Sequence, residues 1–211
     1  MTENLLRYNN KQIFCFWDFE TESLNNVISR PWQMGLLVAT NKEILDRIEK
    51  KIWWPDLNIS ADAALITRFD REQYEREAID SKEALQIFEN IIYDPNIINV
   101  GQNTLAFDCY QHNTWRKVSG FSTDYSYINR AFDTKAIFAA IMKDSKCPLK
   151  NDLLSWQYAH LNMREKGLKT SLAHQMKHFG LVYDADKHHD ALVDVGYTRE
   201  VFRKQLWQVE I

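Results

Sequence analysis

Two carboxylates stand one residue apart at the end of an apolar run. Asp18 and Glu20 follow Gln12–Trp17, whose sequence QIFCFW is typical of a buried strand. Because side chains alternate between the faces of a strand, both carboxylates should point the same way, roughly 6.5 Å apart along the chain. Neighbouring acids on a buried strand repel each other and lose hydration, which favours a site that holds cations. The alternative is a strand that ends there with both acids in water.

A third acid, Asp108, closes the sequence Asn103–Asp108. This segment follows a predicted strand at Ile97–Val100 and leads into a predicted helix. Because sites in α/β sheets form where strands end, Asp108 could join the first two acids. Taken alone, it is typical of an acid near a helix N-terminus, where the helix dipole favours negative charge.

A fourth acid and a histidine stand in the sequence His188–Asp194. In the helix that begins near Asp190, Asp194 lies on the edge of the apolar stripe, from which it can reach the sheet. That stripe consists of Ala191, Val195, Thr198 and Phe202. His189 lies just before the helix, where a mobile imidazole with an ordinary pKa of about 6.5 could take a proton. The alternative is a pair of surface histidines.

The patterns D-x-E, N-x-x-x-F-D and H-x-x-x-x-D follow one another in this order. With these neighbours, the sequence resembles the DEDDh family of 3′–5′ exonucleases from about Phe14 to Phe202. The motifs Phe132-Asp133-Thr134 and Ser171-Leu172-Ala173 support the resemblance.

Within the family, the chain is most similar to the nuclease domain of exonuclease I. This narrower similarity depends on Arg30-Pro31 and on His189–Val195. In the sister DEDDy pattern, a tyrosine would stand at the position of Asp190. The aspartate there favours histidine as the general base.

The resemblance implies a ribonuclease H-like fold and a two-metal site. Four carboxylates suit hard cations, so we expect two Mg²⁺ or Mn²⁺ ions per active site. By resemblance, Asp18, Glu20 and Asp194 hold the ion that carries the attacking water. Asp18 bridges to the second ion, which Asp108 supports through water, and His189 is the general base. The same resemblance makes the motif neighbours substrate-binding residues, namely Phe19, Thr21, Asn103 and Phe107.

The implied reaction is phosphodiester hydrolysis that releases nucleoside monophosphates from single-stranded DNA. Short RNA is the alternative substrate, because the contact to the 2′-hydroxyl cannot be recognised in one sequence. A catalytically dead nucleic-acid-binding module is disfavoured, because the four acids and His189 are all present. Zinc hydrolases are disfavoured by the lack of H-E-x-x-H, and nucleophilic Ser or Cys catalysis by the lack of a Gly-flanked nucleophile beside a base.

The elements that must position these residues alternate between strands and helices. Predicted strands lie at Gln12–Trp17, Trp32–Thr40, Ile44–Trp54 and Ile97–Val100. Predicted helices lie at Ser81–Tyr93, with Ser81 as N-cap, and at about Ala106–Lys117, Thr134–Met142, Thr170–Phe179 and Asp190–Gln205. This order predicts an α/β fold with a mixed β-sheet flanked by helices.

Composition fits one globular domain, which we expect to span residues 1–211. Aromatic residues make up 13% of the chain, which excludes disorder. The longest run without Asp, Glu, Lys or Arg is Pro95–Phe107, too short for a membrane span of about 20 residues. Three cysteines are an odd number without metal-type spacing, so we expect reduced thiols and a cytoplasmic location.

Charge is distributed unevenly. The chain has a net charge of −3, which argues against binding nucleic acid through bulk positive charge, yet Lys143–His178 contains seven bases and three acids. That segment is either a solvated surface or a track for the phosphates of a single strand, with Trp156 and Tyr158 available for stacking. Few residues follow the last predicted helix, so we also expect an open groove and distributive digestion. Protein partners cannot be predicted from the sequence.

Overall fold

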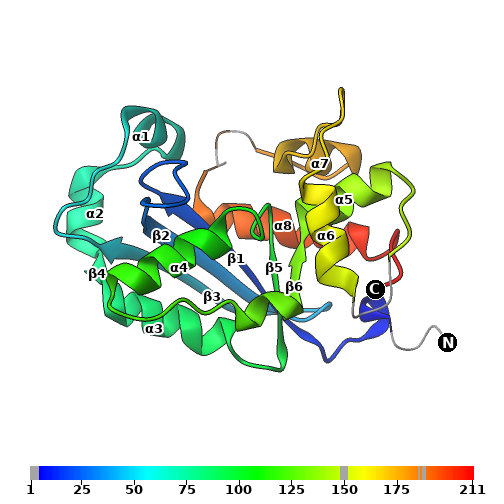
Figure 1. The fold of residues 1–211 in the computed structure, drawn as a ribbon, viewed down its shortest axis with the longest axis horizontal. Coiled ribbons are helices and arrows are strands. Elements are labelled where there is room, and N and C mark those ends of the chain that lie inside the picture. Colours follow the sequence, from blue (N-terminus) through cyan, green and yellow to red (C-terminus); the bar gives the residue numbers. More distant parts are fainter. Residues whose placement is uncertain (1–4, 148–151, 185, 187–188) are drawn as a thin grey trace.

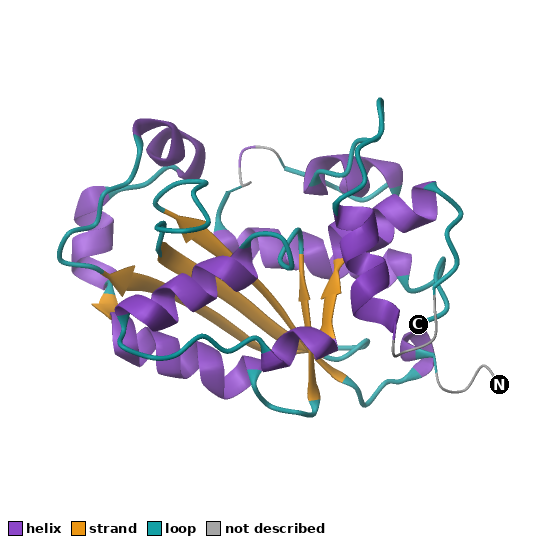
Figure 2. Ribbon diagram, in the orientation of Figure 1, coloured by secondary structure: helices purple, strands orange, loops and turns teal. Residues whose placement is uncertain are grey.

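The computed structural model describes residues 5–147, 152–184, 186 and 189–211 (Figures 1 and 2). Lys150, one of the seven bases of the segment Lys143–His178, and His188 lie outside the described residues. Within the described part of the chain, no helix combines the length and apolar character that crossing a bilayer requires. The cysteines Cys15, Cys109 and Cys147 are free thiols.

The centre of the fold is a six-stranded mixed sheet in the order β4-β3-β2-β1-β5-β6. Three strands form an antiparallel meander, β1 (Ile13–Thr21), β2 (Pro31–Ala39) and β3 (Ile44–Trp53). On the other side of β1, the strands β5 (Ile97–Gly101) and β6 (Ala131–Asp133) run parallel to it. The short β4 (Ile79–Asp80) runs parallel to β3. The α/β fold with a mixed sheet is therefore confirmed.

Helices cover both faces of this sheet (Figure 1). The face that carries Cys15, Trp17 and Phe19 of β1 packs against α3 (Ser81–Ile92) and α4 (Asp108–Val118). The face that carries Phe14 and Phe16 packs against α5 (Thr134–Met142) and α8 (Ala191–Gln205). The remaining helices are α1 (Ala61–Thr67), α2 (Arg71–Glu77), α6 (Leu153–Leu161), α7 (Leu172–His178) and the 3-10 turns η1 (Leu6–Tyr8) and η2 (Ser126–Arg130).

The alternation along β1 continues beyond its apolar part. Phe14 and Phe16 face α8, so Asp18 and Glu20 continue the same face at the carboxyl end of the strand. The strand continues beyond the apolar run Gln12–Trp17 and through both acids to Thr21, so both acids lie on the strand, as the alternation argument expected. Pairing with β2 explains the extension, because Asp18 lies opposite Gly35 and Glu20 lies opposite Gln33.

Several predicted boundaries change because of capping groups. Ser81 was predicted as the N-cap of α3, and this is wrong: Asp80 is the N-cap, and its side chain accepts hydrogen bonds from the amides of Lys82 and Glu83. Helix α4 begins at Asp108 rather than near Ala106, because the preceding turn has Asn103 in the left-handed region, with φ of 64°. Helix α5 has the predicted bounds. Ser171 and Asp190 are N-caps, so α7 and α8 each begin one residue after them.

Gly35 sets how closely α8 approaches the sheet. A Cβ atom at this position would lie 2.4 Å from the carbonyl carbon of Ala191, the first residue of α8. Only glycine permits this contact. Because Gly35 pairs with Asp18 across β1 and β2, the beginning of α8 is held directly over the strand that carries the acids.

We therefore predict that Gly35→Ala lowers the melting temperature. The added methyl group must push the first turn of α8 away, and overpacking of this kind costs about 1–3 kcal/mol, or roughly 2–12 °C for a chain of this size. Gly196→Ala in the same helix is the matched control, because nothing lies within 4 Å of its added Cβ. The control should gain up to about 1 kcal/mol of helix stability. Equal effects of the two substitutions in thermal unfolding would contradict this account of Gly35.

Candidate active site

A cleft of about 410 Å³ lies at the carboxyl ends of β1 and β5, beside the beginning of α8. This edge of parallel strands is where α/β sheets commonly bind their ligands. The cleft brings together eight of the nine predicted site residues from separate parts of the sequence. They are Asp18, Phe19, Glu20, Asn103, Phe107, Asp108, His189 and Asp194.

The ninth, Thr21, is not among the residues that line the cleft. Its side chain is buried, and its hydroxyl donates a hydrogen bond of 2.9 Å to the carbonyl oxygen of Ser23. The strand register shifts between Glu20 and Thr21, so the regular pairing of β1 with β2 is interrupted directly before Thr21. The structure therefore gives Thr21 a local structural contact and does not bring it into the cleft.

The carboxylates of β1 lie at the base of the cleft. Glu20 is 7% exposed, and Asp18 is half-buried. Neither residue forms a salt bridge within the part of the chain that the structure describes. The strand thus holds these two carboxylates in place without an ion pair among the described residues.

Asp108 enters from the other face of the sheet, at the first position of α4. The loop before it is fastened by Asp133, whose carboxylate accepts hydrogen bonds of 3.0 Å from the amides of Asn103 and Leu105. Asp133 also caps α5 by accepting from the amides of Lys135 and Ala136. This fully buried residue therefore fixes the turn that delivers Asp108 to the cleft.

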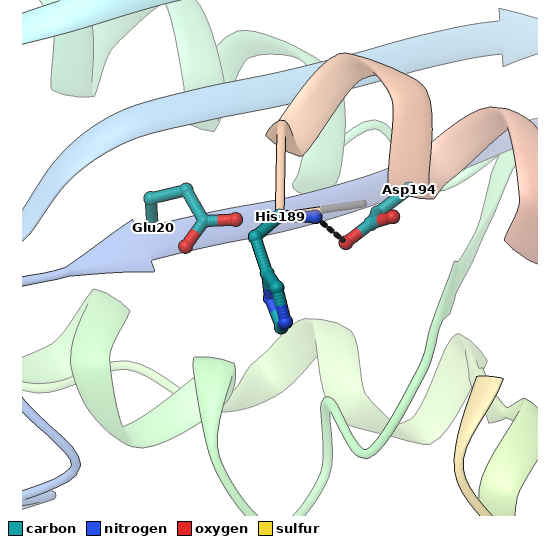
Figure 3. Close-up of side chains that lie close together, drawn as sticks. All are labelled: Glu20, His189 and Asp194. Atoms are coloured by element: carbon teal, nitrogen blue, oxygen red, sulfur yellow. Dashed lines mark hydrogen bonds between the residues drawn. The ribbon is translucent and has the colours of Figure 1, made fainter. Parts of the chain in front are cut away.

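Asp194 and His189 come from the beginning of α8 (Figure 3). Asp190 caps the helix through hydrogen bonds from the amides of Leu192 and Val193. His189 adopts a left-handed backbone conformation, with φ of 66°, and its amide donates a hydrogen bond of 3.2 Å to Oδ2 of Asp194. Ligand atoms of Glu20, His189 and Asp194 all lie within 4.8 Å of one another.

Burial and mutual repulsion dominate the electrostatics of the cleft. Burial raises the pKa of Asp18 well above its ordinary value, and the charges of Asp108, Glu20 and Asp194 raise it further. Burial, with the charges of Asp194 and Asp108, raises the pKa of Glu20 to about 8. Burial likewise raises the pKa of Asp108 to about 8. Each effect disfavours the ionised acid, as expected for crowded carboxylates without bound cations.

This donor set fits divalent cations that prefer oxygen ligands. One oxygen of Asp108, Oδ1, is buried and has no hydrogen-bond partner among the described residues. A buried carboxylate oxygen in that state costs free energy unless a cation or a water meets it. The carboxylates of Asp18, Glu20, Asp108 and Asp194 are the hard ligands that Mg²⁺ and Mn²⁺ prefer.

Several residues of the cleft were not identified from the sequence. Gln102, Lys135 and Thr170 line it together with the acids. Gln102 donates to the carbonyl oxygen of Thr170, and so does the buried Gln175 of α7. Gln205 of α8 donates to Gln175 in turn, so buried amides tie the rim of the cleft to α7 and α8. The one available signal was that Gln102 lies two residues after the predicted strand Ile97–Val100, near the end where sites of α/β sheets form.

The raised pKa values predict how metal-free stability depends on pH. The unfolded chain releases these protons near pH 4, whereas the folded chain keeps those of Glu20 and Asp108 up to about pH 8. The free energy of unfolding should therefore fall as pH rises through this window. We expect the melting temperature in EDTA to drop by at least about 5 °C between pH 5 and pH 8, and Mg²⁺ to restore it.

Asp108→Asn removes one of the repelling charges, so it should raise the metal-free melting temperature at pH 8 and flatten the pH dependence. Asp144→Asn is the control, because Asp144 is exposed and belongs to a different surface hollow. A metal-free protein that becomes more stable from pH 5 to pH 8 would contradict the electrostatic description of the cleft.

No protein-family model and no curated protein matches this sequence. Solved structures of Escherichia coli exonuclease I do match its fold. A complex with a dT13 oligonucleotide is 16% identical, with a TM-score of 0.73, and the match covers 94% of this chain and 42% of that one. A zinc-bound complex with single-stranded DNA is 16% identical, with a TM-score of 0.70 and coverages of 93% and 40%.

A further exonuclease I structure, described as suggesting how processivity is achieved, has 16% identity, a TM-score of 0.71 and the same coverages of 93% and 40%. This chain thus spans about two fifths of the length of the exonuclease I chains that it matches. Its mixed sheet and flanking helices have the ribonuclease H-like fold that the sequence analysis predicted.

Proposed function

We propose that this protein is a metal-dependent 3′–5′ exonuclease that releases nucleoside monophosphates from single-stranded DNA. The observation that carries the proposal is the meeting of Asp18, Glu20, Asp108 and Asp194 in one cleft. They come from three separate elements, and burial and repulsion raise the pKa values of Asp18, Glu20 and Asp108. Such a costly arrangement is expected where cations and a phosphate bind.

We assign two Mg²⁺ or Mn²⁺ ions per active site to these four acids. When bound, such ions polarise the scissile phosphate and stabilise the charge that develops on the attacking and leaving oxygens. The acids themselves bind the ions and hold them at the end of β1. Two dications would also balance the four negative charges of these acids, which removes the repulsion of a polyanionic substrate.

His189 is the proposed general base. Its backbone amide is bound to Asp194, so the residue is anchored while the ring stays at the edge of the cleft, beside Glu20 and Asp194 (Figure 3). An imidazole there can accept the proton of the attacking water near neutral pH. Phe19, Asn103 and Phe107 line the same cleft and are the proposed substrate contacts.

Single-stranded DNA is the proposed substrate because the fold matches exonuclease I, whose structures include complexes with dT13 and dA16 oligonucleotides. Short RNA is the alternative that the experiment must distinguish, since a 2′-hydroxyl contact separates the two substrates. A cytoplasmic location also stays a prediction, based on the odd number of cysteines.

We predict that Asp18→Ala, Glu20→Ala, Asp108→Ala and Asp194→Ala each remove nearly all activity, because each takes a carboxylate from the ions. Matched DNA and RNA oligonucleotides labelled at the 5′ end should be digested in Mg²⁺ and untouched in EDTA. A ladder that shortens from the 3′ end establishes the direction of digestion. The oligonucleotide that is digested faster shows whether the enzyme prefers DNA or RNA. Near-normal Mg²⁺-dependent digestion by Asp18→Ala would contradict the assignment of these acids as ligands of the ions.

For His189→Ala, we predict a loss of about 10²–10⁴-fold in the rate, the usual contribution of a general base. The proximity of His189 to Glu20 and Asp194 allows a second role, as a ligand of the ions. Titration with Mn²⁺ distinguishes the role of general base from the role of metal ligand. If His189 is only the general base, His189→Ala lowers the maximal rate and removes the fall of the rate at acidic pH. The Mn²⁺ concentration needed for half-maximal rate then stays unchanged. A large increase in the Mn²⁺ concentration needed for half-maximal rate would instead make His189 a ligand.

A further inference from the structure

Two smaller hollows adjoin the cleft and share lining residues with it. The first, of about 340 Å³, shares Lys135 and Thr170 with the cleft and extends along the loop 162–171 that follows α6. The second, of about 280 Å³, shares His189 and extends toward β3 and α2. A single strand whose 3′ end lies among the acids must leave the cleft in some direction, and these hollows are the described openings beside it.

Their charges are opposite. Among the described residues, the hollow on the His189 side is lined by the acids Glu49, Asp70, Asp186 and Asp190 against two bases. One of those bases, Lys51, is already paired with Glu77 at 2.6 Å. The hollow on the Lys135 side is lined, within the described chain, by Lys135, Arg164 and Lys166 against the single acid Glu165. A polyanion is attracted to the second and repelled by the first.

The positive surface continues beyond the hollow on the Lys135 side. A further depression shares Glu165, Lys166 and Leu168 with it and adds Lys143 and Lys169. Glu165, the acid common to both, forms an ion pair with Lys143, so these two charges balance each other and the net positive charge comes from Arg164, Lys166 and Lys169. We call the two depressions the basic groove. Arg164, Lys166 and Lys169 are all exposed on the loop 162–171, where they can meet phosphates in water.

Lys135 joins the basic groove to the cleft. It belongs to the first turn of α5, beside the buried Asp133, and its Nζ donates a hydrogen bond of 2.9 Å to Oδ1 of Asn103. Because Asn103 lies in the loop that delivers Asp108, the ammonium group is held at the edge of the acidic cleft. A cation fixed at this boundary is well situated to receive a phosphate that passes between the two.

We propose that the basic groove binds the phosphates on the 5′ side of the bond to be cut, and that Lys135 contacts the phosphate at its entrance to the cleft. This inference rests on the proposed exonuclease function and adds the route of the substrate. It also divides the segment Lys143–His178, which the sequence analysis treated as one candidate track.

Part of that segment does not belong to the track. Lys146 lines a different hollow, together with Asp144 and the C-terminal residues Gln208, Val209 and Glu210. The indole of Trp156 donates to Ser145, and the hydroxyl of Tyr158 donates to the carbonyl oxygen of Leu105. Both rings pack against the hydrophobic clusters, so the structure does not support them as stacking platforms.

The test compares Lys166→Glu with Lys146→Glu. Both positions are exposed lysines of the same segment, and the change of charge is identical. Binding of 5′-labelled single-stranded DNA is measured by fluorescence anisotropy with Ca²⁺ in place of Mg²⁺, a hard cation that offsets the charge of the acids. The measurement covers a range of salt concentrations, with oligonucleotides of 2 and 12 nucleotides. Lys166→Glu should weaken binding of the longer strand about tenfold and reduce its salt dependence, where each phosphate contact contributes a slope of about 0.7.

Lys146→Glu should leave both quantities unchanged, and neither variant should alter binding of the dinucleotide, which we expect to occupy the cleft alone. Lys135→Gln should weaken binding of both lengths. Equal losses for Lys166→Glu and Lys146→Glu, or unchanged binding by Lys166→Glu, would overturn the basic groove. Thermal unfolding of each variant identifies any loss of folding.

This result is distinguishable from failure of the proposed function. Digestion in Mg²⁺ with an unaltered salt slope in Lys166→Glu would refute the groove alone. If the unaltered protein does not digest DNA in Mg²⁺ but Lys166→Glu reduces the salt dependence of binding, the proposed exonuclease function is refuted. The basic groove would then stand as a nucleic-acid-binding surface.

Discussion

The repulsion among buried carboxylates is the constraint on which the rest of this structure depends. Glu20, Asp108 and Asp194 are each less than one-tenth exposed, and Asp18 lies among them. They stay together because apolar packing holds the elements that carry them. On one face of β1, Phe14 and Phe16 pack against Phe202 of α8, and on the other, Trp17 and Phe19 pack against α3 and α4. Each buried aromatic ring contributes about 1.5–3 kcal/mol, which offsets the unfavourable charge.

Local periodicity made part of this site predictable. The alternation of side chains on a strand is enough to put Asp18 and Glu20 on one face, and the structure has both on the face covered by α8. The 3.6-residue period of α8 likewise gave the buried stripe of Ala191, Val195, Thr198 and Phe202 correctly, with Asp194 beside it. Both rules depend only on neighbours within about two turns, so they hold before the tertiary structure is known.

Local periodicity could not predict the residues that act through hydrogen bonds to distant parts of the sequence. Asp133 fastens Asn103 from thirty positions away along the chain, and Gln175 meets Gln205 across the same separation. The error at Ser81 has a local cause, because Asp80 and Ser81 are both good capping residues and only the backbone conformation selects one. Helix α2 is short, and its position depends on Tyr74, whose buried hydroxyl accepts from Trp54 and donates to Ile52.

The arrangement of charge also explains how an acidic chain could bind a polyanion. The acids are buried at the end of the sheet, where bound cations would neutralise their charge at short range, whereas the basic side chains of the groove are exposed to water. Salt screens exposed charges over about 10 Å but acts weakly on buried ones. The affinity for a strand would then depend on ionic strength through the groove, and the chemistry would depend on the cleft. Lys135 and Thr170 line both, and Lys135 is the cationic side chain that the two parts of the surface share.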